Sequence, residues 1–127
     1  MIVDSSALVA VSLGEPDAEE FREVLEYVDD LKMSAGTFLE AAIVLDRRKP
    51  GSIDRLTHGL DIQIIQVDAQ QVDIARHAYR QFGKGSGHPA QLNFGDCFTY
   101  ALAKMTDEPV LFKGDDLSLT DVECVST

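Results

Sequence analysis

The chain has 127 residues, 45% of them hydrophobic and 7% aromatic, which suits one globular domain spanning residues 1–127. A formal net charge of -11 argues against a protein that coats nucleic acid through a broad basic face. No apolar run approaches the roughly 18 residues needed to cross a bilayer, and the opening residues lack the basic region of a signal peptide. We therefore expect a cytoplasmic protein that does not bind membranes.

The first elements alternate between strand and helix. Residues 1–3 predict a strand, and the capping residues in "DSS" predict a helix that Gly14 ends. Pro16 suits the first turn of the next helix, which is amphipathic. Residues 15–30 hold eight of the 22 acids, so much of the excess negative charge belongs to one solvated helix face.

The rest of the chain continues this alternation. A strand at residues 31–34 leads into a helix that is apolar nearly all round from Phe38 to Leu45 and should be well buried. Later in the chain, a Gly-rich loop is expected at residues 83–93. Further strands are expected at 62–67, 109–114 and 122–125, and further helices at 53–61, 68–82 and from about 96. Strands that alternate with helices imply an α/β fold with a parallel sheet between two helical layers.

Acidic side chains stand at several junctions of these elements. The pair Asp115–Asp116 and the single Asp4 each follow a strand, while Asp96 begins a helix and Glu40 lies early in another. Ligands of parallel sheets bind beyond the carboxyl ends of the strands, so these acids could share one crevice. Two like charges about 4 Å apart repel by on the order of 4 kcal/mol at an effective dielectric of 20. A cation would relieve that repulsion, and all-oxygen ligands favour Mg²⁺ or Mn²⁺ over zinc.

Each acid also has a purely structural interpretation. Asp4 could cap the first helix, and Glu40 could form a capping box with Thr37. Asp96 could be a cap or a first-turn acid favoured by the helix dipole, and Asp115–Asp116 could be ordinary turn residues. The remaining nucleophiles and ligands show no catalytic or zinc-binding spacing; they are His58, His77, Cys97 and Cys124. Taken one at a time, the acids leave both interpretations open.

Taken together, the motifs resemble the PIN-domain family, specifically the VapC-type toxin ribonucleases of bacterial toxin–antitoxin modules. The resemblance covers most of the chain in order, through "MIVDSSALVAV", "FLEAAIVL", "LNFGDCFTYALAK" and "PVLFKGDDLSLTDV". It implies a three-layer α/β/α fold around a mainly parallel sheet. One departure is Leu117, because related toxins usually have Phe after the acidic pair.

The resemblance also implies roles for individual residues. The metal-binding acids of the family fall on Asp4 and Asp96, and its helical acid falls on Glu40. The fourth acid falls on one of the pair Asp115–Asp116, with the first of the two preferred. Ser6 matches the small hydroxyl residue that supports the first acid in this family.

The activity implied by the resemblance is Mg²⁺-dependent or Mn²⁺-dependent hydrolysis of RNA phosphodiester bonds. Relatives of this type are dimers and are silenced by a cognate VapB-type antitoxin that wraps over the acids, so we expect a homodimer and such a partner. An acidic chain must hold RNA through a few basic residues beside its metal-binding pocket. The candidates for contact with RNA are Lys84, His88 and Lys113.

Two alternatives belong to other functional classes. A phospho-acceptor receiver-like domain also combines a parallel sheet, Mg²⁺ and a late lysine such as Lys113. A receiver needs paired acids after its first strand, however, whereas Asp4 stands alone, and Glu40 and Asp96 would have no role. A catalytically inactive PIN-like interaction module is disfavoured because it has no need for four mutually repelling carboxylates.

Overall fold

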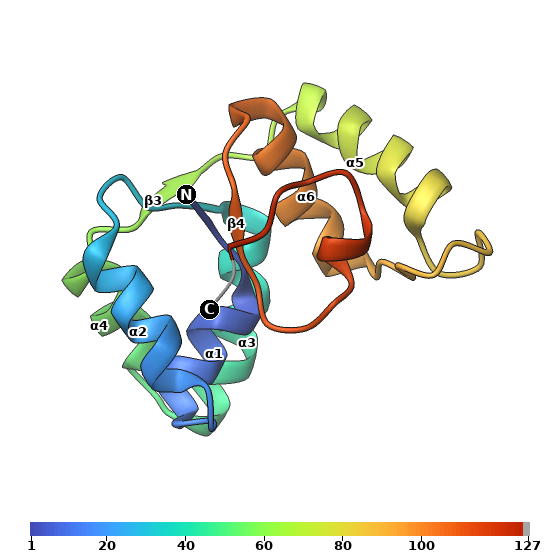
Figure 1. The fold of residues 1–127 in the computed structure, drawn as a ribbon. Coiled ribbons are helices and arrows are strands. Elements are labelled where there is room, and N and C mark those ends of the chain that lie inside the picture. Colours follow the sequence, from blue (N-terminus) through green and yellow to red (C-terminus); the bar gives the residue numbers. More distant parts are fainter. Residues whose placement is uncertain (126–127) are drawn as a thin grey trace.

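The computed structural model describes residues 1–125, and its elements alternate as the sequence predicts (Figure 1). The strands are β1 (Ile2–Val3), β2 (Lys32–Ser34), β3 (Gln63–Ile65) and β4 (Val110–Leu111). The helices are α1 (Ser5–Leu13), α2 (Ala18–Tyr27), α3 (Ala35–Arg48), α4 (Ser52–Gly59), α5 (Ala69–Phe82), α6 (Phe94–Thr106) and the short 3-10 helix η1 (Leu117–Leu119). Within residues 1–125, no helix combines the length and the apolar character needed to cross a membrane.

The four strands form one parallel sheet in the order β3-β2-β1-β4. Ile2 pairs with Lys32 on one side and with Val110 on the other. Successive strands are joined by α1 and α2, then by α3 and α4, then by α5 and α6, which gives the long crossovers that parallel strands require. The predicted α/β fold with a parallel sheet between helices is confirmed.

Neighbouring residues of the central strands point to opposite faces of the sheet. Val3 and Leu111 pack with side chains of α1 and α2 in one buried cluster, whereas Ile2 and Val110 pack with side chains of α5 and α6 in another. This alternation is the period of two that a strand imposes. Figure 1 accordingly shows α1, α2 and α4 on one side of the sheet and α5 and α6 on the other.

Some of the predicted strands and helices are shorter in the structure than the sequence suggests. The strand predicted at 122–125 is reduced to one bridge between Cys124 and Val110, because this segment forms only two backbone hydrogen bonds with Val110. β4 itself is shorter than the predicted 109–114. Pro16 lies in the turn before α2, whose N-cap is Asp17.

The prediction that the apolar helix at 35–48 is well buried is wrong. Leu39 and Ile43 of α3 are each 60% exposed, and Val44 is also exposed. The buried side of α3 is limited to Thr37, Ala41 and Leu45, which face the rest of the molecule. Leu39, Ile43 and Val44 thus form an exposed apolar stripe on this single chain, while Phe38 and Ala42 are partly buried against the core.

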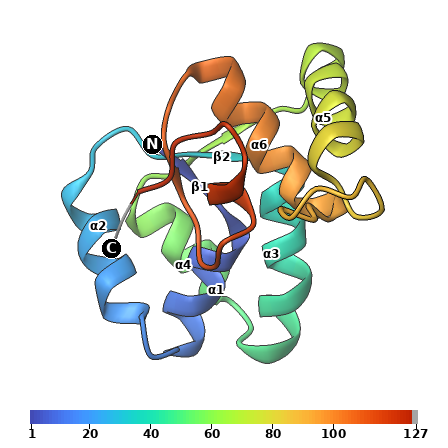
Figure 2. The ribbon, with the colours of Figure 1, turned by 45° about the vertical axis from the view of Figure 1, so that its right-hand side comes forward.

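One segment links the carboxyl end of the sheet to the start of α1. Figure 2 shows the chain from β4 to η1 passing close to the beginning of α1. The backbone N–H of Lys113 donates to Ser6 Oγ over 2.9 Å, and the N–H of Asp4 donates to the carbonyl of Leu111 over 3.1 Å. These bonds fix the loop that carries Asp115 and Asp116 beside the residues that follow β1.

Candidate metal centre

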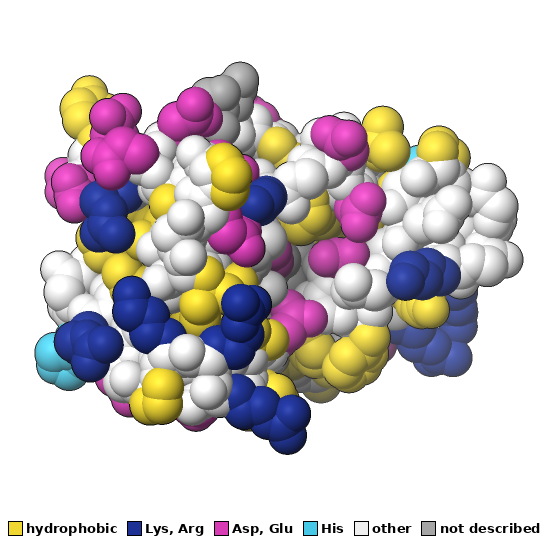
Figure 3. All heavy atoms as spheres, turned by 90° about the horizontal axis from the view of Figure 1, so that it is seen from below, with side chains coloured by type: hydrophobic (Ala, Val, Ile, Leu, Met, Phe, Trp, Pro, Cys, Tyr) yellow, Lys and Arg dark blue, Asp and Glu magenta, His cyan; other side chains and the backbone are white. Residues whose placement is uncertain are grey.

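The predicted acids come from four separate segments that meet at the carboxyl end of the sheet. Asp4 directly follows β1, Glu40 lies on α3, Asp96 lies in the first turn of α6 and Asp116 directly precedes η1. Figure 3 views the molecule from below and shows acidic side chains in and around a hollow in the middle of this face, with basic side chains to either side. The crevice expected from the parallel topology is therefore lined with negative charge.

Asp4 is buried, with 2% of its surface exposed, and both of its carboxylate oxygens accept hydrogen bonds. Oδ2 accepts from the backbone N–H of Ser6 over 3.0 Å and from Ser6 Oγ over 2.7 Å. Oδ1 accepts from the hydroxyl of Thr99 on α6. Asp4 is the N-cap of α1, so the structural interpretation of this residue holds together with its place in the acidic crevice.

Asp96 is also nearly buried, and it belongs to a capping box. Asn93 is the N-cap of α6 and accepts from the N–H of Asp96 over 2.9 Å, while Asp96 Oδ2 accepts from the N–H of Asn93 over 3.0 Å. Burial raises the pKa of the Asp96 carboxyl to about 6 even though the bond from Asn93 opposes this rise. The charges of three other acids contribute to the same rise; they are Asp4, Asp116 and Glu40.

Glu40 does not form the capping box that "TFLE" suggests. Ser34 is the N-cap of α3, and the hydroxyl of Thr37 lies against Thr99 instead. Glu40 Oε1 accepts from Ser5 Oγ over 2.6 Å. A Cβ on Gly95 would lie 1.9 Å from Glu40 Oε2, so only glycine at 95 leaves room for this carboxylate beside the start of α6.

The fourth predicted acid falls on the pair Asp115–Asp116, of which Asp116 directly precedes η1. Asp116 is among the charges that raise the pKa of Asp96. The carbonyl of Asp115 accepts from Ser118 Oγ over 2.7 Å, as expected of a turn residue. Adjacent acids in a turn could not be separated by sequence, since only the backbone path decides which one faces the crevice.

Two of the three residues predicted to contact RNA already have protein partners. Lys113 Nζ lies 2.7 Å from a carboxylate oxygen of Glu15 and 3.2 Å from one of Asp17. His88 Nδ1 accepts from the N–H of Ala90 over 3.0 Å, and its ring packs edge-on against Phe82. Lys84 is exposed in the Gly-rich loop, so it is the candidate of the three that retains a free approach to a phosphate.

Within residues 1–125, no ion pair involves the acids of this crevice; the ion pairs present join other residues. The carboxylates thus carry uncompensated charge, which a hard cation would neutralise. In the same described part of the chain, no three acidic, histidine or cysteine side chains are close enough to enclose an ion by themselves. This donor set fits Mg²⁺, which keeps several waters and is usually held by one or two carboxylates together with substrate phosphates.

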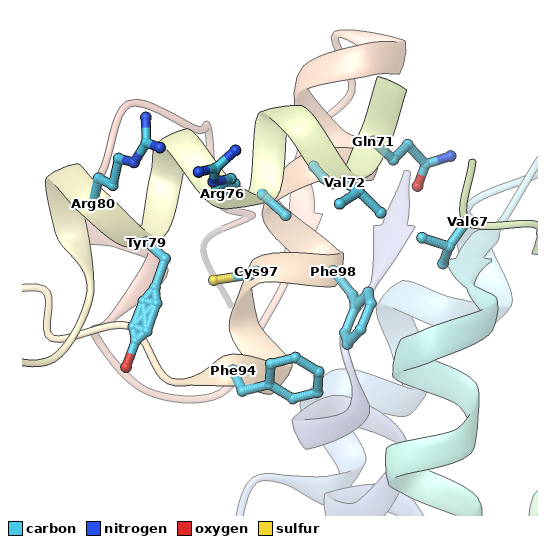
Figure 4. A pocket seen from close by; sticks show the side chains of 11 residues that line it. Val67, Gln71, Val72, Arg76, Tyr79, Arg80, Phe94, Cys97 and Phe98 are labelled. Atoms are coloured by element: carbon cyan, nitrogen blue, oxygen red, sulfur yellow. The ribbon is translucent and has the colours of Figure 1, made fainter. Parts of the chain in front are cut away.

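Nothing in the sequence indicated an apolar groove beside the acidic crevice. An apolar groove of about 720 Å³ runs between α5 and α6, lined among others by Val72, Tyr79, Phe94 and Phe98 (Figure 4). Phe94 is 76% exposed and stands two residues before Asp96. Cys97 also lines the groove, but burial raises the pKa of its thiol to about 11, so it is no nucleophile at neutral pH.

Comparisons with known proteins agree with this fold. The model of the PIN domain family matches residues 1–123. The chain is 46% identical over 131 residues to the ribonuclease VapC42 of Mycobacterium tuberculosis, with 100% of both chains covered. It is also 46% identical over 129 residues to a ribonuclease VapC of Mycolicibacterium smegmatis, covering 98% of this chain and 99% of the relative.

Two solved structures share the fold at low sequence identity. VapC20 of Mycobacterium tuberculosis, described as a toxin that cleaves the sarcin-ricin loop, superposes with a TM-score of 0.77 at 16% identity, covering 99% of this chain and 98% of that one. A toxin–antitoxin complex from Klebsiella pneumoniae gives a TM-score of 0.71 at 14% identity, with 92% and 89% covered. At these identities the likeness concerns the fold alone.

Proposed function

Because this chain belongs to the PIN domain family, and within it to the VapC type, we propose that it is a metal-dependent endoribonuclease and the toxin of a toxin–antitoxin pair. The observation that carries the proposal is the group of four uncompensated carboxylates, in which the charges of Asp4, Glu40 and Asp116 raise the pKa of Asp96. Ribonuclease is the activity named for relatives that are 46% identical over the whole chain.

Asp4 and Asp96 would hold the cation, and Glu40 and Asp116 would complete its surroundings. Bound Mg²⁺ or Mn²⁺ supplies a Lewis acid that polarises the phosphodiester and stabilises the charge on the leaving oxygen. The chain supplies rigid oxygens for that ion: Ser6 and Thr99 fix the carboxylate of Asp4, and Asn93 fixes that of Asp96. Such preorganisation means that little reorganisation is needed when the substrate binds.

RNA is held by few basic groups in this proposal. The net charge of -11 precludes strong general attraction of a polyanion, so the neutralised metal centre must provide much of the local affinity. Exposed basic side chains that could hold phosphates are Arg47, Arg48, Arg76, Arg80 and Lys84. Substrate choice would then rest on RNA shape and on a limited contact surface.

A VapB-type antitoxin would exploit the same unpaired charge. An arginine of such a partner could form charge-assisted hydrogen bonds with the carboxylates and take the place of the cation. The fold shared with a toxin–antitoxin complex supports this part of the proposal. We expect a protein encoded beside this one to suppress cleavage when the two are mixed, and an unrelated acidic protein to have no effect.

A homodimer is the proposed state of the free toxin. The exposed apolar stripe of α3 and the groove between α5 and α6 include Ile43 at 60% and Phe94 at 76% exposure, and large exposed apolar side chains that cluster mark protein interfaces. Light scattering should therefore give twice the chain mass of 13.9 kDa. Replacing Ile43 by Glu should shift the mass towards that of one chain.

The deciding experiment is RNA cleavage with and without Mg²⁺ or Mn²⁺ by wild type, Asp4→Asn and Asp96→Asn. The cleavage rate of both variants should fall by more than roughly 10–100-fold, which is the loss caused by removing an outer-sphere partner of a metal. Asp46→Asn is the matched control, because Asp46 is an exposed acid on the same helix as Glu40. Cleavage that survives chelation, or that both site variants retain in full, would refute the metal-dependent mechanism.

A further inference from the structure

Two buried hydroxyl groups connect helices α3 and α6 to the first acid of the site. Thr37 and Thr99 each have 0% of their surface exposed, and their Oγ1 atoms lie 3.1 Å apart. Thr99 Oγ1 donates to Asp4 Oδ1. A threonine hydroxyl carries one proton, so once Thr99 has donated to Asp4, it is Thr37 that must donate to Thr99. The three groups form a directed chain from Thr37 through Thr99 to Asp4.

This arrangement is unusual for threonines inside helices. A helical threonine commonly bonds back to a carbonyl three or four residues earlier. Thr57 and Thr106 do so, donating to the carbonyls of Ile53 and Leu102 over 2.9 and 2.8 Å. The hydroxyls of Thr37 and Thr99 are instead directed across the helix interface towards a carboxylate.

The close approach of the two helices makes the chain possible. A Cβ on Gly36 would lie 2.7 Å from ring atoms of Phe98, so glycine at 36 lets α6 pack directly against the first turn of α3. Thr37 and Thr99 follow these two residues and meet inside the interface. No water is needed to satisfy either hydroxyl in this position.

The hydrogen bonds on Asp4 leave a single direction open. A carboxylate has about four acceptor sites, two on each oxygen. The N–H and Oγ of Ser6 occupy both sites of Oδ2, and Thr99 occupies one site of Oδ1. The second site of Oδ1 is the one that remains, so the Thr99 hydroxyl determines which way the free lone pair of Asp4 points.

We propose that Thr99 is a positioning residue that aims Oδ1 of Asp4 at the divalent cation, and that Thr37 fixes the direction of the Thr99 proton. This inference rests on the proposed metal-dependent function. Outer-sphere partners of metal ligands typically contribute 10–100-fold to metal affinity. Thr99 contacts no substrate in this scheme and acts only through the carboxylate that it orients.

The test is Mn²⁺ affinity, followed by calorimetry or electron paramagnetic resonance, for variants that remove or keep the hydroxyl. Thr99→Val preserves the shape of the side chain and should weaken Mn²⁺ binding by roughly 10–100-fold, while Thr99→Ser should stay within a few-fold of wild type. Thr37→Val should weaken binding by a smaller factor, because Thr99 keeps its own bond to Asp4. Thr106→Val is the matched control on the same helix and should bind Mn²⁺ as wild type does.

Several outcomes separate this proposal from the proposed function. Wild-type affinity in Thr99→Val, or a loss in Thr99→Ser as large as that in Thr99→Val, would overturn the positioning role alone. A wild-type chain that binds no Mn²⁺ would overturn both. If Thr99→Val fails to fold, Thr37→Val and Thr99→Ser decide: wild-type affinity in Thr37→Val, or a loss in Thr99→Ser larger than a few-fold, would overturn the positioning role.

Discussion

The two ends of the parallel sheet treat acidic residues in opposite ways. At the amino end, Glu108 lies 2.7 Å from the amine of Met1 and 2.6 Å from Lys32 Nζ, which also pairs with Asp30 over 3.0 Å. At the carboxyl end, within residues 1–125, the acids around Asp96 have no cationic partner. The same fold therefore contains one compensated and one uncompensated group of acids.

The difference between the two groups of acids is visible in their pKa values. Burial alone would raise the pKa of Glu108, but the hydrogen bonds from Lys32 and from the Met1 amine lower it below its ordinary value. Burial raises the pKa of Asp96, and neighbouring acids push it in the same direction, to about 6. The charges at the amino end stabilise the fold, whereas the burial and mutual repulsion of the acids at the carboxyl end destabilise it.

The largest effect on the uncompensated group of acids is expected from a substitution at Gly95. In Gly95→Ala the new Cβ would collide with the carboxylate of Glu40, which sits at the end of a flexible side chain and can swing away. We expect RNA cleavage to fall by about 100-fold, the loss typical of a displaced catalytic group, with little change in the melting temperature. Cleavage assays and thermal unfolding of the same preparation measure both quantities. A large fall in the melting temperature together with the loss of cleavage would mean that Gly95 is needed for packing of the fold.

Removing a charge from the uncompensated group should stabilise the metal-free protein. Asp96→Asn keeps an acceptor for the N–H of Asn93 and deletes the charge, so the free energy of unfolding at pH 7.5 should rise by about 1–3 kcal/mol. A raised folded-state pKa destabilises the fold fully above about pH 6 and not at all below the ordinary value near 4. The gain should therefore shrink as the pH falls across that window; a pH-independent gain would contradict this origin.

The opposite sign is expected at the compensated end. Glu108→Gln should lower the free energy of unfolding by about 1 kcal/mol near pH 7, because two partly exposed ion pairs are weakened. A lowered folded-state pKa contributes stability above the ordinary pKa near 4.3, and that contribution is lost as the pH falls through the folded value. Denaturant unfolding near pH 7 and below the ordinary pKa measures this difference. Glu26→Gln, on the exposed side of α2, is the control at each pH.

The sequence predicted the order of elements well because local patterns determine it. The apolar strands were recognisable, and so were the helix ends. Gly14 and Gly83 are indeed the C-cap residues of α1 and α5. The burial of α3 was wrong because an apolar stripe looks the same whether it meets a core or a partner surface. Contacts across the fold, such as those of Thr37 and Thr99, depend on which helices pack together, and no local spacing encodes that.

The acids themselves were identifiable, but their geometry was not. Asp4 and Asp96 were ambiguous between cap and site. In the structure, Asp4 is the N-cap of α1 and Asp96 completes the capping box of α6, and both lie in the acidic crevice. Helix ends hold a short carboxylate in one orientation, so capping and ligation are compatible uses of the same residue. The pairing of Lys113 with Glu15 and Asp17 was missed because those residues are far apart in the chain.

The contact between Gly36 and Phe98 has a mechanical consequence. With an aromatic ring seated directly on the backbone of α3, the two helices have no slack to slide past each other. Glu40 and Asp96 ride on these helices, so thermal motion should carry them together as one rigid body. The separation between the two carboxylates would then fluctuate less than the surface loops around them, and hydrogen exchange along α3 and α6 should be correspondingly slow.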